Sequence, residues 1–356
     1  MKSKTYRALL LVSMLMSLVF AVTNVSAQSQ SDSYWLIDLG TLPGDVQSVA
    51  FDINNPGQIV GRSTKATGAH HAVLWDNGII TDLGMLPDDD FSEARAINNQ
   101  GEIVGLSGHH AVLWDNGTII DLGMLPGDDT ASATGINERG QIIGSGAGGS
   151  PGDVGFIAPH AVLWDNGSII DLGILETWFD PSIGRLDFSH AYGINDRGQI
   201  VGVSTTSTGV HAVLWDNDTI TDLGTLPGHN YSEALGINER GQIMGLSGVW
   251  ADGCNAGQCS AVLWENGTIR DLGIPMTSWG LASGINNRGQ IVFASFQSYL
   301  GGEGFNRAVI WNNGTITDLG ALAAPGSGLS GAFGNNDRGQ IVGFSVEVVG
   351  AALWTR

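Results

Sequence analysis

Five side chains that could act together as acids, bases or orienting groups stand in short apolar segments of the sequence. Glu93 and Arg95 are two positions apart, as are His190 and Tyr192. Glu233 occupies the equivalent place in a third segment. Residues two apart in an extended strand project to the same face. A glutamate, a histidine and a tyrosine on one surface could cleave a glycan by acid–base chemistry. The alternative is that these side chains pack around a polar, water-filled channel.

Aromatic residues in the least regular stretches form a second set of candidates. A flat apolar ring suits stacking on a sugar ring or contact with an apolar partner. These residues predict a ligand-binding platform, and packing within loops is the alternative. They are Trp178, Phe179, Tyr231, Trp250 and Trp279.

The two cysteines, Cys254 and Cys259, fall in one such stretch. An even pair in an exported chain predicts a disulfide, which here would shape a short loop.

Residues that often bind metals do not form a recognised ligand pattern. Four histidines occupy one repeated position, which distributes them around a ring, and no complete Asp-x-Asp-x-Asp-Gly loop occurs. We therefore predict no metal site and no cofactor, with calcium on loop carboxylates as the alternative. The histidines are His71, His110, His160 and His211, and the carboxylates are Asp45, Asp88, Asp89, Asp90, Asp128 and Asp129.

The composition limits the class of protein to which this chain can belong. Hydrophobic residues make up 42% of the 356 residues and charged residues 14%, which argues against a disordered chain or a coiled coil. The formal net charge of −20 argues against a nucleic-acid binder, because phosphate contacts require clustered Lys and Arg.

The first residues have the pattern of an export signal. Lys2, Lys4 and Arg7 precede an apolar run over residues 8–22, and Val25-Ser26-Ala27 is a small-residue cleavage site. The apolar run is short for a transmembrane helix. We predict a signal peptide over residues 1–27, cleavage near Ala27, and a secreted protein, periplasmic or extracellular, without membrane insertion.

Three phrases recur seven times each and define a repeat. Asp-Leu-Gly begins at Asp38, Asp82, Asp121, Asp171, Asp222, Asp271 and Asp318. A tryptophan closes an apolar run at Trp75, Trp114, Trp164, Trp215, Trp264, Trp311 and Trp354. An Asn-x-x-Gly phrase starts at Asn54, Asn98, Asn137, Asn195, Asn238, Asn286 and Asn336.

Each repeat contains four short strand-like segments, as the unit from Glu233 to Gly273 shows. The segments 233–238, 242–247, 260–264 and 268–273 are rich in Ile, Val, Leu and Trp. Asn-Gly between two such segments is a strong hairpin signal. Four antiparallel strands repeated seven times predict an all-β, seven-bladed β-propeller.

The frame of the repeats predicts how the ring closes. The seventh repeat has segments 331–336, 340–345 and 350–354 but no fourth strand. The segment 34–40 has the sequence of a fourth strand and precedes the first complete repeat. Pairing of the two would remove exposed sheet edges and would make residues 34–356 a single propeller domain.

The repeats resemble the HAF-repeat family of extracellular repeat proteins. The matching text is His71-Ala-Val-Leu-Trp75, which recurs from His110, His160 and His211, accompanied by the Asp-Leu-Gly and Gly-Ile-Asn phrases. Val73 and its equivalents stand where the family name implies phenylalanine. The resemblance implies an extracellular propeller-like protein and adds little about activity.

Loops that break a repeat usually carry its function. We call the end of the blades that holds the first and third hairpin turns the bottom, and the opposite end, where the connections vary, the top. We predict a monomeric binding module that recognises a polysaccharide, a cell-surface polymer or another extracellular protein at the top. A glycan hydrolase or lyase at the top channel mouth and a structural envelope or matrix protein are the alternatives.

Overall fold

The computed structural model describes residues 30–31, 34–148, 157–180, 184–249, 259–276, 282–296, 306–322, 328–346 and 349–356. Within these ranges the regular structure is entirely β, with strands β1 to β31 and no helix. No helix among the described residues is long and apolar enough to span a membrane. The predicted signal peptide lies outside the described residues.

Four sheets have four antiparallel strands each. The first two contain β3 (Gln47–Ile53), β4 (Ile59–Thr64), β5 (His70–Asp76) and β6 (Ile79–Asp82), and β7 (Ser92–Ile97), β8 (Ile103–Ser107), β9 (His110–Asp115) and β10 (Thr118–Asp121). The others contain β11 (Thr130–Ile136), β12 (Ile142–Gly148), β13 (Ile157–Asp165) and β14 (Ser168–Asp171), and β25 (Ala282–Ile285), β26 (Ile291–Phe296), β27 (Asn306–Asn312) and β28 (Thr315–Asp318).

An eight-stranded sheet joins two further four-stranded groups through one parallel bridge between Val210 and Tyr231. The groups are β17 (Ser189–Ile194), β18 (Ile200–Thr206), β19 (Gly209–Asp216) and β20 (Thr219–Asp222), and β21 (Tyr231–Ile237), β22 (Ile243–Gly248), β23 (Cys259–Glu265) and β24 (Thr268–Met276). A five-stranded sheet holds β1 (Gln30–Ser31), β2 (Tyr34–Asp38), β31 (Val349–Thr355), β30 (Ile341–Val346) and β29 (Leu329–Asn335), and a small hairpin holds β15 (Trp178–Asp180) and β16 (Gly184–Leu186).

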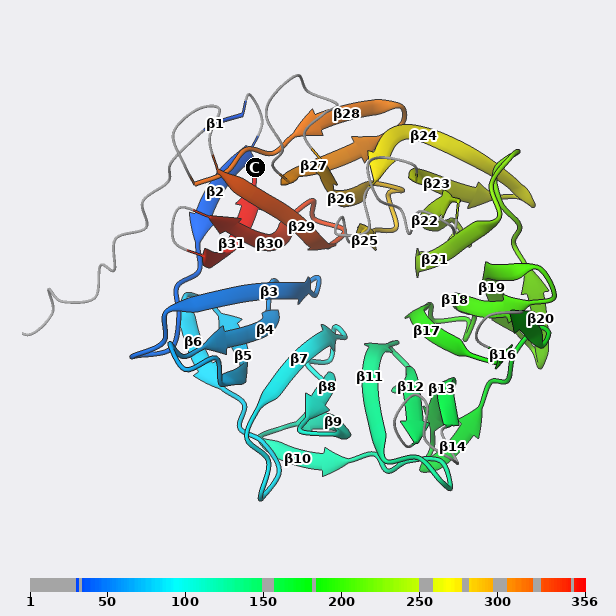
Figure 1. The fold of residues 1–356 in the computed structure, drawn as a ribbon. Helices are drawn as coiled ribbons and strands as arrows, with labels where there is room; N and C mark the ends of the chain where they lie inside the picture. The colour runs from blue at the N-terminus through cyan, green and yellow to red at the C-terminus, as the bar shows by residue number, and fades with distance from the viewer. Residues whose placement is uncertain are drawn as a thin grey trace, which may run out of the picture.

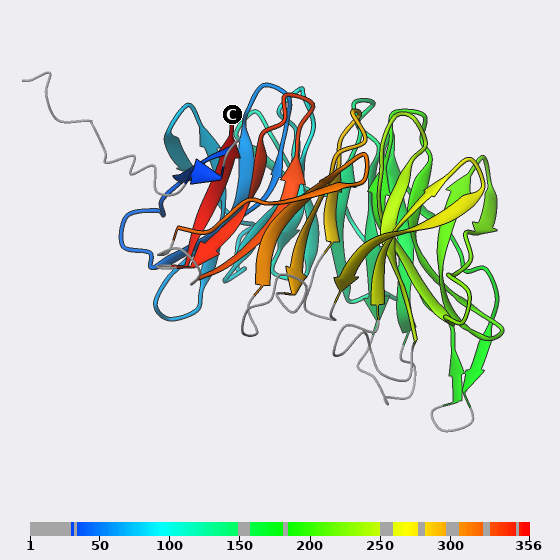
Figure 2. The same cartoon turned by 90° about the horizontal axis from the view of Figure 1, so that it is seen from above.

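These sheets are arranged around a central opening, with one strand of each four-stranded group and of the five-stranded sheet innermost (Figure 1). The innermost strands are β3, β7, β11, β17, β21, β25 and β29. Figure 2 shows the strands running side by side between the two ends of the molecule, with the top at the lower edge of the view. The prediction of an all-β propeller built from antiparallel four-stranded sheets is confirmed.

The Asn-Gly pairs of the repeats form the hairpin turns that their sequence predicts. Asn166 and Gly167 between β13 and β14 both have positive φ, as a type I′ hairpin turn requires. One turn departs from this pattern, because Asp218 follows Asn217 and adopts a φ of 61° without being glycine.

The hydrophobic core lies between neighbouring sheets. In one cluster Val60 and Ala72 of the sheet β3–β6 pack against Ala94, Val112 and Trp114 of the next sheet, and all five are buried. The repeated tryptophan therefore fills the space between two sheets in each repeat, which explains its regular recurrence.

The strand that pairs with β31 in the five-stranded sheet comes from the opposite end of the described chain. Residues Trp35 to Asp38 of β2 pair antiparallel with Ala352 to Thr355 of β31. Tyr34, Leu36 and Trp354 are fully buried in one cluster. The predicted pairing of segment 34–40 with the last repeat is therefore present as hydrogen-bonded strands.

Hydrogen bonds connect the bottom turns from one sheet to the next. The side-chain nitrogen of Asn54 donates to the carbonyl of Asn98, and each equivalent asparagine repeats this contact with the next turn. Asn336 then donates to the carbonyl of Asn54 at 2.9 Å. The seven asparagines of the repeat phrase thus form a continuous circuit of hydrogen bonds, which we call the asparagine circuit.

Every innermost strand carries a β-bulge at the same place, which sequence alternation did not predict. The register shifts between Ala94 and Ala96 in β7 and at the equivalent alanine of the other six strands. At Gly105 of β8, a methyl group would overlap the carbonyl oxygen of Glu93. The second strands keep glycine at this position because the bulge presses a carbonyl oxygen against them. Phe293 replaces this glycine in β26.

Candidate functional site

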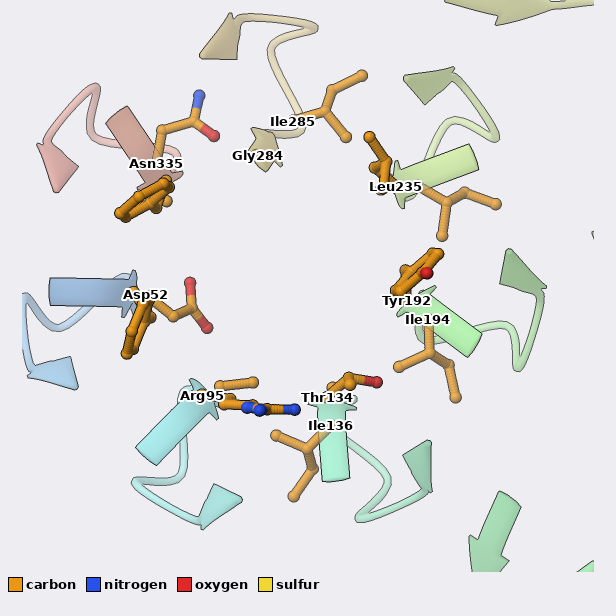
Figure 3. Close-up of a pocket in the computed structure, with 18 residues that line it drawn as sticks. Asp52, Arg95, Thr134, Ile136, Tyr192, Ile194, Leu235, Gly284, Ile285 and Asn335 are labelled. Carbon is orange, nitrogen blue, oxygen red and sulfur yellow. The ribbon is translucent and has the colours of Figure 1, made fainter. Parts of the chain in front are cut away.

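The bulges turn one side chain of each innermost strand toward the central opening, where a cavity of about 220 Å³ lies (Figure 3). A bulge re-aims the residue it contains. The bulged residues that line the cavity are of five types in six strands: Phe51, Arg95, Thr134, Tyr192, Leu235 and Phe333. The same backbone feature therefore presents varied chemistry around the opening.

Glu93 binds two arginines at one side of the cavity. Its carboxylate accepts a hydrogen bond from Arg62 Nη1 at 2.6 Å and one from Arg95 Nε at 3.0 Å. Glu93 is only 7% exposed, whereas the side chains of Arg62 and Arg95 are 38% and 34% exposed. Arg62 also lies over the ring of Phe51. One buried carboxylate thus fixes two guanidinium groups that remain open to solvent.

His190 and Tyr192 form a stacked aromatic pair on β17. Their ring centroids are 6.0 Å apart and the rings are inclined by 7°. Burial lowers the pKa of His190, which favours the neutral imidazole. Burial and the nearby Glu233 raise the pKa of Tyr192, so its hydroxyl stays protonated.

Glu233 on β21 lies close to this pair. It accepts a hydrogen bond from the hydroxyl of Tyr231. Burial raises the pKa of Glu233, and the hydrogen bond from Tyr231 opposes that shift. The pKa of Tyr231 is raised by burial and by the same carboxylate. A carboxyl group that holds its proton more readily than usual is suited to general-acid chemistry.

The predicted catalytic residues therefore separate into two groups. Glu93 and Arg95 form one group with Arg62, and His190, Tyr192 and Glu233 form the other with Tyr231. No contact joins the two groups within the part of the chain that the structure describes. The expectation that Glu93 shares a surface with His190 and Tyr192 as one constellation remains a prediction.

The aromatic platform is placed only in part. Tyr231 was expected in a loop, but it begins strand β21 and its hydroxyl is bonded to Glu233. Trp178 and Phe179 lie in the connection between β14 and β17, where they form strand β15, which pairs with β16. The correction to Tyr231 arises because pairing with Gly248 extends β21 beyond its apolar segment. Trp250 and Trp279 lie outside the described residues.

The described residues include no free cysteine. Cys259 is buried at the start of β23. Cys254 lies outside the described residues, so its disulfide with Cys259 stays a prediction.

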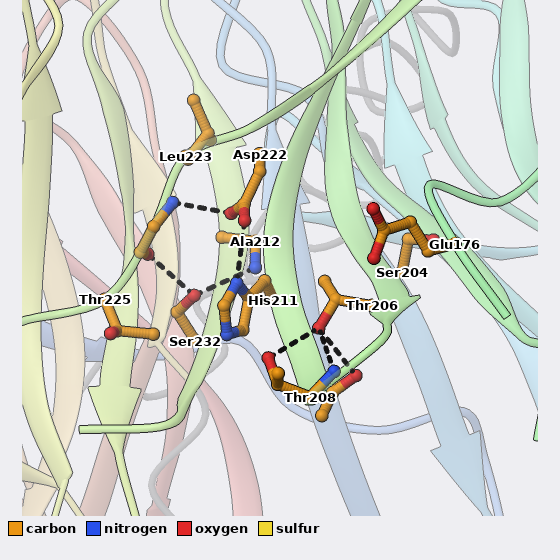
Figure 4. Close-up of polar contacts among 12 residues, drawn as sticks. Glu176, Ser204, Thr206, Thr208, His211, Ala212, Asp222, Leu223, Thr225 and Ser232 are labelled. Carbon is orange, nitrogen blue, oxygen red and sulfur yellow. Dashed lines mark hydrogen bonds and ion pairs between the residues drawn. The ribbon is translucent and has the colours of Figure 1, made fainter. Parts of the chain in front are cut away.

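The repeated histidines pair with the aspartate of the Asp-Leu-Gly phrase. His211 Nδ1 lies 2.9 Å from Asp222 Oδ2, while Asp222 Oδ1 accepts the Gly224 amide at 2.7 Å (Figure 4). Burial alone would raise the pKa of Asp222, but the hydrogen bonds from His211 and Gly224 lower it. The described part of the chain has no cluster of three or more His, Cys, Asp or Glu placed to hold a metal ion.

Asp52 was not singled out from the sequence, although it also lines the cavity. It accepts hydrogen bonds from the amides of Ile53 and Ile97. Burial in the channel wall raises its pKa, against the effect of these two amides. The equivalent position holds glycine in five innermost strands and Ala96 in β7. A lone aspartate among these glycines was the available signal.

No protein-family model matches the chain, and no curated protein is similar to it in sequence. The resemblance to HAF repeats therefore stays a prediction. Solved structures share the fold. The β-propeller domain of the Trilobed protease from Pyrococcus furiosus is 10% identical with a TM-score of 0.51, over 87% of this chain and 94% of that one.

An extracellular domain from B. thetaiotaomicron is 7% identical with a TM-score of 0.51, over 89% of this chain but only 39% of that one. A gluconolactonase from Xanthomonas campestris is 10% identical with a TM-score of 0.41, over 90% of this chain and 89% of that one. The first two likenesses place the chain among proteins with a β-propeller fold. At these identities they show the fold alone.

Proposed function

We propose that residues 34–356 form one seven-bladed propeller that is secreted after cleavage near Ala27. The eight-stranded sheet counts as two blades in this proposal, because a single parallel bridge joins its halves. The pairing of β2 with β31 supports closure of the ring by the N-terminal strand. The asparagine circuit supports the same conclusion, since its last member returns to its first.

We propose that the protein is a binding module for a carbohydrate or surface polymer, and that the ligand enters the top mouth of the channel. One contrast carries this proposal. The bottom end has the same asparagine contacts in every repeat, whereas the innermost strands present aromatic, charged and apolar side chains to the inside of the channel, above those turns. Stacked rings beside fixed hydrogen-bonding groups suit a sugar, which has apolar ring faces and hydroxyl edges.

A glycan-array screen followed by titration of any bound glycan tests the proposal. The informative variant replaces His190 with Ser and Tyr192 with Leu, because Ser132 and Leu235 occupy the equivalent positions in β11 and β21. We expect at least a tenfold loss of affinity with the fold retained, since each lost ring removes about 1 kcal/mol. The control is Arg240→Thr in a bottom turn, and equal binding by all three proteins would refute a site at the mouth.

The three tryptophans of the predicted platform extend the same proposal. Changing Trp178, Trp250 and Trp279 together to Ala should weaken retention on the bound glycan if they form the platform. Unchanged retention would remove the platform and leave the channel mouth as the site.

Glycan cleavage is a second candidate, favoured by Glu233. Its raised pKa and its contact with Tyr231 give the mouth one carboxyl group suited to donate a proton. Product analysis on any bound polymer tests this, with Glu233→Gln as the variant. Cleavage that persists in that variant would exclude Glu233 as the acid.

A further inference from the structure

The cluster of charged side chains at the channel contains more positive than negative groups. Two guanidinium groups, from Arg62 and Arg95, share the single carboxylate of Glu93. The cluster therefore carries one positive charge in excess, within a chain whose formal net charge is −20. Each guanidinium has five N–H donors. Arg95 binds Glu93 through Nε and Arg62 binds it through Nη1, which leaves further donors on both groups.

Arg95 is the member of this cluster that reaches the cavity. It is the bulged residue of β7 and lines the cavity beside Thr134 (Figure 3). Its Nε contact with the nearly buried Glu93 fixes the orientation of the planar group. A fixed guanidinium binds a carboxylate through two parallel hydrogen bonds.

The acidic side chains near the cavity already accept hydrogen bonds from other groups of the protein. Asp52 also lines the cavity, and both of its oxygens accept backbone amides, from Ile53 and Ile97. Glu233 accepts the Tyr231 hydroxyl. The charged donors on this cavity come from Arg95, with Arg62 beside it, and the protonated hydroxyl of Tyr192 adds a neutral donor.

We propose that the ligand of the channel mouth is an acidic sugar whose carboxylate binds Arg95, with Arg62 held beside it by Glu93. This inference rests on the proposed function and names the ligand class for that site. The cavity of about 220 Å³ is smaller than a pocket for a drug-sized ligand, which is about 300–1,000 Å³. It therefore receives one sugar ring of a chain. The net negative charge of the protein acts over longer distances and is screened beyond about 8 Å in physiological salt, so the contact charges decide the specificity.

The test compares a trimer of galacturonic acid with a trimer of galactose by calorimetric titration at constant ionic strength. The acidic trimer should bind more tightly. Free galacturonic acid forms the third arm, and equal binding of monomer and trimer would show that the ring in the cavity carries the affinity. Arg95→Thr copies the residue at Thr134 and should weaken binding of the acidic trimer at least tenfold, since a charged hydrogen bond contributes about 1.5–3 kcal/mol.

A second variant moves the affinity in the opposite direction. Glu93→Gln keeps a hydrogen-bonding side chain beside the arginines but removes the compensating charge, so the acidic trimer should bind several-fold more tightly. A gain of affinity cannot arise from misfolding. Arg240→Thr in a bottom turn removes the same charge away from the mouth and should leave binding unchanged.

The outcomes separate this inference from the proposed function. If the galactose trimer binds as tightly as the acidic one and Arg95→Thr has no effect, the acidic ligand is wrong and a carbohydrate site remains. If Arg240→Thr weakens binding as much as Arg95→Thr, the effect is one of total charge and the inference fails. If no sugar binds to the wild-type protein, both proposals fail.

Discussion

At the scale of single residues, the differences between repeats carry the chemistry. The bulged position of the innermost strands holds phenylalanine at Phe51, arginine at Arg95 and tyrosine at Tyr192, on one repeated backbone. Asp52 is likewise an exception, at a position where the other innermost strands have glycine or alanine. The residue at the equivalent position of another repeat can therefore replace each exceptional residue in a control variant, because the backbone there is the same.

Replacing Asp218 with Gly should stabilise the protein. Asp218 has a φ of 61°, a region that costs a residue with a side chain about 1 kcal/mol and costs glycine little. Denaturant unfolding should show a gain of about that size. The reverse change, Gly167→Asp in the equivalent turn, serves as the control and should lose a similar amount. A variant Asp218→Gly that unfolds earlier than wild type would contradict this account of the turn.

The raised pKa of Glu233 predicts how one variant responds to pH. An acid whose pKa is higher in the folded state stabilises the fold fully at pH values below its unfolded pKa, and this contribution is lost as the pH rises through the folded pKa. Glu233→Gln does not titrate. The free energy of unfolding of this variant, relative to wild type, should therefore rise as the pH increases above about 4, the ordinary pKa of a glutamate. A difference that stays constant with pH would show that Glu233 titrates normally.

At the scale of strands, the bulge in β7 depends on a glycine in the neighbouring strand β8. The bulge in β7 pushes the carbonyl oxygen of Glu93 toward Gly105 of β8, which leaves no room for a methyl group. The bulge aims Arg95 into the cavity, so the glycine in the neighbouring strand is part of the site's construction.

Gly105→Ala should therefore cost about 2–3 kcal/mol of stability and weaken any ligand bound by Arg95. Gly167→Ala is the control, because Gly167 has a positive φ but no neighbouring atom within reach of an added methyl group. That control should lose only about 1 kcal/mol. Equal losses in thermal or denaturant unfolding would show that overlap with Glu93 is unimportant.

The strands could be predicted from the sequence because each has a local signal. Trp264 closes one apolar run, and the pair Asn266 and Gly267 marks the turn after it. The bulges had only a weak signal, because each breaks the alternation once, just before a turn, as the spacing of three between the buried residues Ala234 and Ile237 shows. Tyr231 was misplaced because strand β21 begins two residues before its apolar segment, where pairing with Gly248 and Val210 extends it.

At the scale of the whole molecule, the asparagine circuit makes the repeats depend on one another. Asn238 is 3% exposed, and its nitrogen donates to Gln242 Oε1 and to the carbonyl of Asn286. Its oxygen accepts the amides of Arg240 and Gln242. All four hydrogen bonds of a buried amide are satisfied, so its loss leaves several backbone groups without partners.

Asn238→Ala and Asn336→Ala should each lower the free energy of unfolding by about 2–3 kcal/mol. The two losses should be equal, because Asn336 contacts Asn54 as Asn238 contacts Asn286. Urea unfolding of the two variants provides the comparison. A distinctly smaller loss at Asn336 would mean that the circuit is weak where the two ends of the chain meet.

The pairing of β2 with β31 also determines when this sheet can be completed during synthesis of the chain. The ribosome makes Trp35 among the first described residues and its partner Thr355 among the last. The edge of β2 that pairs with β31 therefore stays open while every other sheet is produced, and an open strand edge is prone to association with other chains. A chain interrupted anywhere before Val349 presents the same open edge of β2. The burial of Tyr34 and Leu36 against Trp354 therefore depends on the last strand that the structure describes.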